Sequence, residues 1–97
     1  MRRCVHRLAL LAAAALSTPA AAETVKIGAA FSLTGNAAVY GGQQKAGVLL
    51  AVDEINKSGK LPGITLEAVV EDDATSKEQG INVFQRFINR DKVSAII

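Results

Sequence analysis

Apolar residues in this chain gather in three short runs that have the character of β-strands. Residues 25–31 are apolar or small except for Lys26, which predicts a strand covered on both faces in a parallel sheet. Residues 64–70 are enriched in β-branched side chains and predict a second strand, closed by an acidic triplet at 71–73. A third apolar run, at 93–97, predicts the third strand.

The segment between the first two runs has the periodicity of an amphipathic helix from about residue 43 to residue 57. Its apolar residues recur at i, i+3, i+4 and i+7, which is the spacing of one buried helix face. These residues are Val48, Ala51, Val52 and Ile55. Ser58-Gly59 then provides a C-terminal stop, and Leu61-Pro62-Gly63 provides a turn into the second strand.

A second helix is expected between the second and third strands. Its start is marked by a capping box, formed either by Thr75 with Glu78 or by Ser76 with Gln79. The apolar residues predicted to share one face of this helix are Ile81, Phe84, Phe87 and Ile88. Asp91-Lys92 then connects the helix to a strand that starts at Val93.

The predicted order β-α-β-α-β defines the expected fold class. Both crossovers have the length that joins parallel strands, and such crossovers are right-handed in almost all proteins. The chain is therefore expected to be α/β, the start of a doubly wound parallel-sheet lobe, truncated in its third strand. Because 93–97 stops inside an apolar run without turn residues, we expect this segment to be the first part of a longer protein.

Residues 1–22 have the three-part build of a secretory signal peptide. Three arginines precede an apolar run at 8–16, and Ala20-Ala21-Ala22 offers an A-x-A cleavage site. The apolar run is about half of the roughly 20 residues that a membrane-crossing helix needs, so no permanent anchor in the membrane is expected. The expected mature protein is periplasmic and begins at Glu23.

Removal of this leader changes the charge balance and the cysteine content. It takes away three of the eleven Lys and Arg and none of the nine Asp and Glu, so the mature net charge is −1. No nucleic-acid partner is therefore expected. Cys4 and His6, the one cysteine and the one histidine of the chain, both lie in the leader. Catalysis by cysteine or histidine is thus excluded for residues 23–97.

The glycines after the first strand do not have the spacing of a nucleotide-binding loop. A dinucleotide fingerprint needs G-x-G-x-x-G, whereas Gly28, Gly35 and Gly41-Gly42 stand too far apart. A P-loop fails as well, because no Gly-Lys-Ser/Thr follows the first strand. Asp72 is placed like the acidic ribose ligand of dinucleotide folds, but that role is not expected without the glycine triplet. A Rossmann-like enzyme is therefore disfavoured.

Asp72-Asp73 has the composition of half a metal site or of a general acid–base pair. No other carboxylate or histidine of the mature chain belongs to a supporting motif. The favoured interpretation is structural, with one aspartate capping the turn into the second helix and the other solvated. No metal site is therefore expected.

The loop at 32–42, SLTGNAAVYGG, carries the remaining candidate chemistry. Ser32 and Thr34 supply hydroxyl groups, Gly35 leaves main-chain N–H groups accessible, and Tyr40 has a flat apolar face with a polar tip. Such a loop suits a small polar or zwitterionic ligand. The alternative, in which Tyr40 packs on a neighbouring helix and the glycines only turn the chain, fits these residues equally well.

A series of short motifs extends this interpretation: KIG, SLTG, YGGQQKAG, AVDEIN, EDDA and INRDKVSAII. In this order and spacing, from Thr24 to Ile97, they resemble the amino-terminal segment of branched-chain amino acid binding proteins. These are the periplasmic receptors of ABC importers, with the type 1 periplasmic-binding-protein fold. The resemblance implies a two-lobed protein several times longer than this chain, which closes on an amino acid. It also implies a membrane permease as partner, no catalysis and no cofactor.

The resemblance also implies roles for residues of the loop. The position of Tyr40 carries an aromatic that packs against the ligand side chain, and Ser32, Thr34 and Gly35 would edge the cleft. The position of Asp72-Asp73 looks structural in the family.

The chain departs from the family in two respects. Some relatives have a disulfide near the DDA turn, where this chain has Ala74 and Thr75. The main amino acid clamp of the family lies in the loop after the third strand and in the second lobe, beyond Ile97. Two further interpretations stay open: the ligand-sensing domain of a signalling receptor, and a truncated remnant without function. The resemblance implies a branched-chain or related amino acid as the ligand. The family also includes receptors for amides, urea and aromatic acids, and an aromatic at Tyr40 does not separate these ligands from leucine or valine.

Overall fold

The computed structural model describes residues 23–97, and the predicted leader with its cleavage site lies outside these residues. The elements in chain order are β1 (Glu23–Phe31), α1 (Ala38–Ser58), β2 (Ile64–Asp72), α2 (Lys77–Arg86), a π-helical turn η1 (Phe87–Asp91) and β3 (Ala95–Ile96). The predicted order β-α-β-α-β is confirmed. None of the described helices combines the length and apolar character that a membrane span requires.

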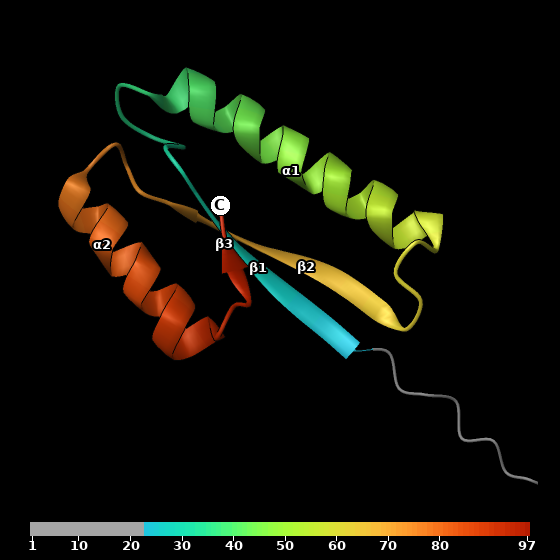
Figure 1. Ribbon diagram of the computed structural model, residues 1–97. Coiled ribbons are helices and arrows are strands. Elements are labelled where there is room, and N and C mark those ends of the chain that lie inside the picture. Colours follow the sequence, from blue (N-terminus) through green and yellow to red (C-terminus); the bar gives the residue numbers. More distant parts are fainter. Residues whose placement is uncertain (1–22) are drawn as a thin grey trace, which may run out of the picture.

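The three strands form one parallel sheet in the order β2-β1-β3. The register of β1 and β2 places Glu23 opposite Ile64 and Phe31 opposite Asp72, so both strands end at the same edge. Helices α1 and α2 cover opposite faces of the sheet (Figure 1). Crossovers between parallel strands are right-handed in almost all proteins, and two that run in opposite directions along a sheet place their helices on opposite faces. The α/β class and the doubly wound start are therefore confirmed.

The packing of η1 and α2 on the sheet depends on a missing side chain in β1. Phe87 and Val83 are fully buried, and a Cβ on Gly28 would lie 2.8 Å from the Phe87 ring. Glycine at this position therefore gives the ring the space to approach the strand backbone. Ala29 and Phe31 are the other buried apolar residues, which places the core around the central strand.

The predicted apolar face of α2 is only partly correct. Phe87 is buried, but Ile81, Phe84 and Ile88 are 50%, 45% and 61% exposed, and Val83 takes the buried position instead. The segment has two apolar stripes, and periodicity alone does not tell which one faces the sheet. The π-helical geometry that begins at Phe87 also changes the phase of the residues after it.

The predicted face of α1 needs one correction. Val48, Val52 and Ile55 are half-buried as expected, whereas Ala51 is exposed. At its end, Gly59 adopts φ 70° and stops the helix as predicted.

Several element boundaries differ from those predicted, and β1 begins at Glu23 rather than Val25. Helix α1 begins at Ala38 rather than near residue 43, because Gly41-Gly42 belongs to its first turns instead of forming a turn of its own. Strand β2 extends to Asp72, and β3 begins at Ala95 rather than Val93. Of the two predicted caps the structure uses Ser76, whose side chain accepts a hydrogen bond from the Gln79 N–H at 3.3 Å. The Ser76 N–H donates to the Asp73 carbonyl at 2.9 Å, so the box with the Gln79 side chain is not formed.

Strand β2 is an edge strand of the described sheet, and its free side is partly covered by α1. The Asn56 amide of α1 pairs with the backbone of Leu66 there: Nδ2 donates to the Leu66 carbonyl at 2.9 Å, and Oδ1 accepts from its N–H at 2.8 Å. This side chain thus takes the place of a neighbouring strand at one position. It also fixes the C-terminal half of α1 on the sheet.

The two adjacent glycines of α1 provide a matched test of this packing. A Cβ on Gly41 would overlap the Ser32 carbonyl oxygen, whereas a Cβ on Gly42 would have nothing within 4 Å. We expect Gly41→Ala to lower the free energy of unfolding by about 1–3 kcal/mol through overpacking. Gly42→Ala should raise it by up to ~1 kcal/mol, because alanine has the higher helix propensity. Urea unfolding measures both, and equal effects of the two substitutions would contradict the proposed contact.

Candidate functional site

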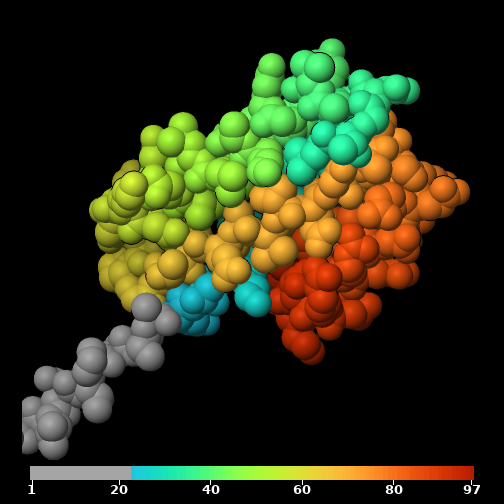
Figure 2. Space-filling view, turned by 180° about the vertical axis from the view of Figure 1, so that it is seen from behind, coloured from blue at the N-terminus to red at the C-terminus, as the bar shows by residue number. Residues whose placement is uncertain are grey.

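Two loops lie side by side at the carboxyl ends of β1 and β2. We call them the first loop (residues 32–37) and the second loop (residues 73–76). In Figure 2 the teal atoms of the first loop contact the orange atoms of the second at one end of the molecule. They meet because the parallel register brings Phe31 and Asp72 to the same edge of the sheet.

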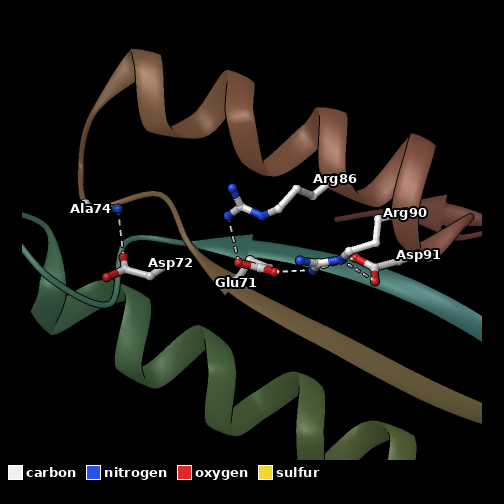
Figure 3. A network of polar contacts seen from close by, with 6 residues as sticks. All are labelled: Glu71, Asp72, Ala74, Arg86, Arg90 and Asp91. Atoms are coloured by element: carbon white, nitrogen blue, oxygen red, sulfur yellow. Dashed lines mark hydrogen bonds and ion pairs between the residues drawn. The ribbon is translucent and has the colours of Figure 1, made fainter.

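Asp72, the last residue of β2, holds both loops with one carboxylate. Its Oδ1 accepts hydrogen bonds from the Leu33 N–H at 2.8 Å and, as Figure 3 shows, from the Ala74 N–H at 2.7 Å. Its Oδ2 accepts a hydrogen bond from the Thr34 hydroxyl at 2.6 Å. The Thr34 N–H adds a longer bond to Oδ1, of 3.3 Å.

Asp73 makes a second connection of the same kind. Its Oδ1 accepts hydrogen bonds from the Ser32 hydroxyl at 2.6 Å and from the Thr75 N–H at 2.8 Å. Its own N–H donates to the Phe31 carbonyl at 3.0 Å. The expectation that one aspartate of the pair is merely solvated is therefore wrong. Both join the second loop to the first, and each caps a turn of its own loop.

The charge state of Asp72 decides what the first loop can offer a ligand. Hydrogen bonds from the Thr34 hydroxyl, and then from the Ala74 N–H, hold the pKa of Asp72 below its ordinary value of 3.8. The carboxylate is therefore ionised at neutral pH and only accepts, so the Thr34 hydroxyl hydrogen points toward it. The Ser32 hydroxyl is likewise turned toward Asp73. Both hydroxyls keep lone pairs that can accept a hydrogen bond from a ligand.

Tyr40 lies in the first turn of α1, beside these loops. The residue is 71% exposed, so it does not pack on a neighbouring helix within the described residues. Gly35 has φ 83°, and a Cβ there would lie 2.8 Å from Thr75 Oγ1. The fold thus brings the four predicted site residues to one end of the sheet: Ser32, Thr34, Gly35 and Tyr40.

A second polar network, which the sequence pattern did not predict, holds α2 and η1 on β2. The two carboxylate oxygens of Glu71 pair with Arg86 at 2.9 Å and with Arg90 at 2.8 Å, and Arg90 also pairs with Asp91 (Figure 3). The hydrogen bond from Arg86, followed by that from Arg90, lowers the pKa of Glu71. The available signal was the i, i+4 spacing of the two arginines after an acidic strand end.

The other candidate features of residues 23–97 lie elsewhere or are absent. A hollow of about 200 Å³, lined by Glu54, Ile55, Ser58 and Lys60, lies at the end of α1 farthest from Tyr40. Within the described residues, no three His, Cys, Asp or Glu side chains are grouped to hold a metal ion.

Open α/β sheets bind ligands at the carboxyl ends of their strands, where the strand order reverses. In this chain β1 has β2 on one side and β3 on the other, and the paired loops and Tyr40 lie at that edge. The fold places the segment in the class of open α/β domains with a topological switch point. Residues 24–97 match a family described as periplasmic binding protein, and the chain belongs to this family.

Known relatives agree with this assignment. The chain is 40% identical over 94 residues to a leucine-, isoleucine-, valine-, threonine-, and alanine-binding protein of Pseudomonas aeruginosa, which covers 92% of this chain and 25% of that protein. It is also similar to the branched-chain amino acid transporter substrate binding protein LivJ of Streptococcus pneumoniae in complex with isoleucine. That match has a TM-score of 0.72 and 36% identity, and covers 76% of this chain and 21% of the other.

A further solved structure is a possible leucine/isoleucine/valine-binding protein of Rhodopirellula baltica. It matches with a TM-score of 0.75 and 30% identity, over 82% of this chain and 22% of the other. The chain thus spans about a quarter of the length of the relatives it matches. The resemblance to branched-chain amino acid binding proteins is confirmed.

The Asp72 contacts predict a specific acid dependence of stability. Because the pKa of Asp72 is lowered on folding, its contribution is present above 3.8 and is lost as the pH falls below that value. We expect Asp72→Asn to lower the urea midpoint at pH 7 and to flatten its decline between about pH 5 and pH 3. Asp53→Asn is the control, because Asp53 makes only an exposed ion pair with Lys57. Parallel acid profiles for wild type and Asp72→Asn would contradict this role.

Proposed function

We propose that this chain is the amino-terminal part of a periplasmic solute-binding receptor that serves an ABC importer. Residues 1–22 are the signal peptide, and residues 23–97 begin the first lobe of the ligand-binding domain. The receptor binds a branched-chain or related amino acid and delivers it to a membrane permease. The observation that carries this proposal is the exposed ring of Tyr40 next to the fixed loop 32–35, in a chain of the periplasmic binding protein family.

In this proposal the described residues form one wall of the amino acid cleft. Tyr40 supplies an apolar face for the ligand side chain, and the Ser32 and Thr34 hydroxyls supply hydrogen-bond acceptors at the edge. Asp72 and Asp73 fix the loop that forms this edge. The opposite wall belongs to the remainder of the receptor, and closure of the two lobes signals occupancy to the permease.

The proposed role is binding without catalysis. The strand-end carboxylates, which are the groups best suited to acid–base chemistry here, are engaged by hydrogen bonds of the two loops. The first relative is named for the amino acids it binds, which include leucine, isoleucine and valine. These three are therefore the first ligands to test.

The direct test is isothermal titration of the full-length secreted protein with L-leucine, L-isoleucine and L-valine. We expect saturable one-to-one binding of at least one of them, to a protein whose first residue is Glu23. Binding heat with an amide but not with these amino acids would change the assigned ligand to an amide, within the same family. No heat with any of these compounds would contradict the proposed function.

Tyr40 and its neighbour Val39 offer a matched pair of variants, because both side chains are 71% exposed. Tyr40→Ala should weaken L-leucine binding by about tenfold, or ~1.4 kcal/mol, since the ring loses its contact with the ligand side chain. Tyr40→Phe and Val39→Ala should bind like wild type. None of the three variants should change the thermal midpoint of the ligand-free protein by more than about 1–2 °C. Equal affinities of Tyr40→Ala and wild type would exclude Tyr40 from the ligand wall.

A further inference from the structure

Helix α1 begins without a cap from its own side chains. Its N-cap residue is Ala37, whose methyl group accepts no hydrogen bond, although the first N–H groups of a helix need partners. The second loop instead binds the N–H of the N-cap residue itself. Thr75 Oγ1 accepts a hydrogen bond from the Ala37 N–H at 3.3 Å and donates one to the Thr34 carbonyl at 2.9 Å. One hydroxyl therefore bridges the two sides of the first loop.

The backbone at Thr75 is unusual for its residue type. Ala74 and Thr75 have φ 54° and φ 55°, in the left-handed region that β-branched residues rarely occupy. Asp72 and Asp73 hold this conformation by accepting the N–H groups of Ala74 and Thr75. Glycine would adopt the same backbone with less strain. The hydrogen bonds of the Thr75 hydroxyl to Ala37 and Thr34 therefore explain why a threonine occupies this strained position.

The bridged segment leads directly into the turn that carries Tyr40. The Ala37 carbonyl accepts hydrogen bonds from the Tyr40 N–H at 3.1 Å and from the Gly41 N–H at 3.2 Å. Because the Tyr40 side chain is mostly exposed, packing contributes little to its position. The backbone of this first turn therefore sets where the ring stands, and Thr75 holds the start of that turn.

We propose that Thr75 is a positioning residue of the amino acid site, whose hydroxyl fixes the Tyr40 turn against the loop 32–35. It touches no ligand and acts by ordering the wall before the ligand arrives, which lowers the entropic cost of binding. This inference rests on the proposed function, because it assigns Tyr40 to the ligand wall.

Three substitutions at Thr75 test the role in titrations of the full-length protein with L-leucine. Thr75→Val removes the hydroxyl but keeps the shape, and should weaken binding roughly 3- to 10-fold. Thr75→Ser restores the hydroxyl and should bind within about twofold of wild type. Thr75→Gly removes the hydroxyl and the strain together. Its unfolding midpoint should equal or exceed that of wild type while its affinity falls.

The glycine variant separates positioning from a merely structural role. If Thr75 were merely structural, Thr75→Gly would change stability and affinity in the same direction. If Thr75 positions the Tyr40 turn, affinity falls while stability is kept or rises. Affinities of both Thr75→Val and Thr75→Gly within about twofold of wild type would overturn the inference. The glycine variant decides the matter where the valine variant does not fold.

Hydrogen exchange of the ligand-free protein distinguishes failure of this inference from failure of the proposed function. Thr75→Val should speed exchange in residues 34–41 and leave β1 unchanged, with Thr75→Ser matching wild type. Unchanged exchange in the valine variant would overturn the positioning role whether or not leucine binds. If Thr75→Val exchanges faster but the protein binds none of the three amino acids, the proposed function is rejected. The inference that the Thr75 hydroxyl orders residues 34–41 is then retained.

Discussion

The hydrogen bonds that the Asp72 carboxylate accepts from the first loop are the constraint on which the proposed site depends. Parallel pairing of β1 and β2 brings the ends of both strands to one edge, and Asp72 then joins the first loop to the second. Asp73 and Thr75 add to the same connection. Since Tyr40 leaves from this connected segment, the position of an exposed aromatic ring is fixed by polar contacts rather than by burial.

Local patterns were sufficient to predict the architecture. Apolar runs, helical periodicity and turn residues predict the three strands, the two helices and the Gly59 stop, because each depends on residues close in sequence. They leave two candidates for the cap of α2, of which the structure uses Ser76. The start of α1 was wrong because Gly41-Gly42 looks like a turn. Gly41 in fact lets the helix approach the Ser32 carbonyl, which is a contact between separate elements. The choice of Val83 over Ile81 as a buried residue likewise depends on where Gly28 admits the Phe87 ring.

The candidate residues of the proposed site are predicted from the sequence, whereas the orientation of their hydroxyl groups is not. The sequence predicts Ser32, Thr34 and Tyr40 as ligand-binding residues, and the fold brings them to one edge of the sheet. It did not reveal that both hydroxyl hydrogens are turned toward Asp72 and Asp73, since that depends on the register of two strands. In the proposed receptor these hydroxyls therefore accept hydrogen bonds, and they do not provide donors for the carboxylate of an amino acid.

A crystal structure of the full-length protein with bound L-leucine tests the central claim most directly. The predicted result is a leucine side chain in van der Waals contact with the Tyr40 ring, beside a loop 32–35 still held by the Asp72 carboxylate. A leucine bound away from Tyr40, or a first loop that has left Asp72, would contradict a ligand wall ordered in advance by the contacts between the two loops.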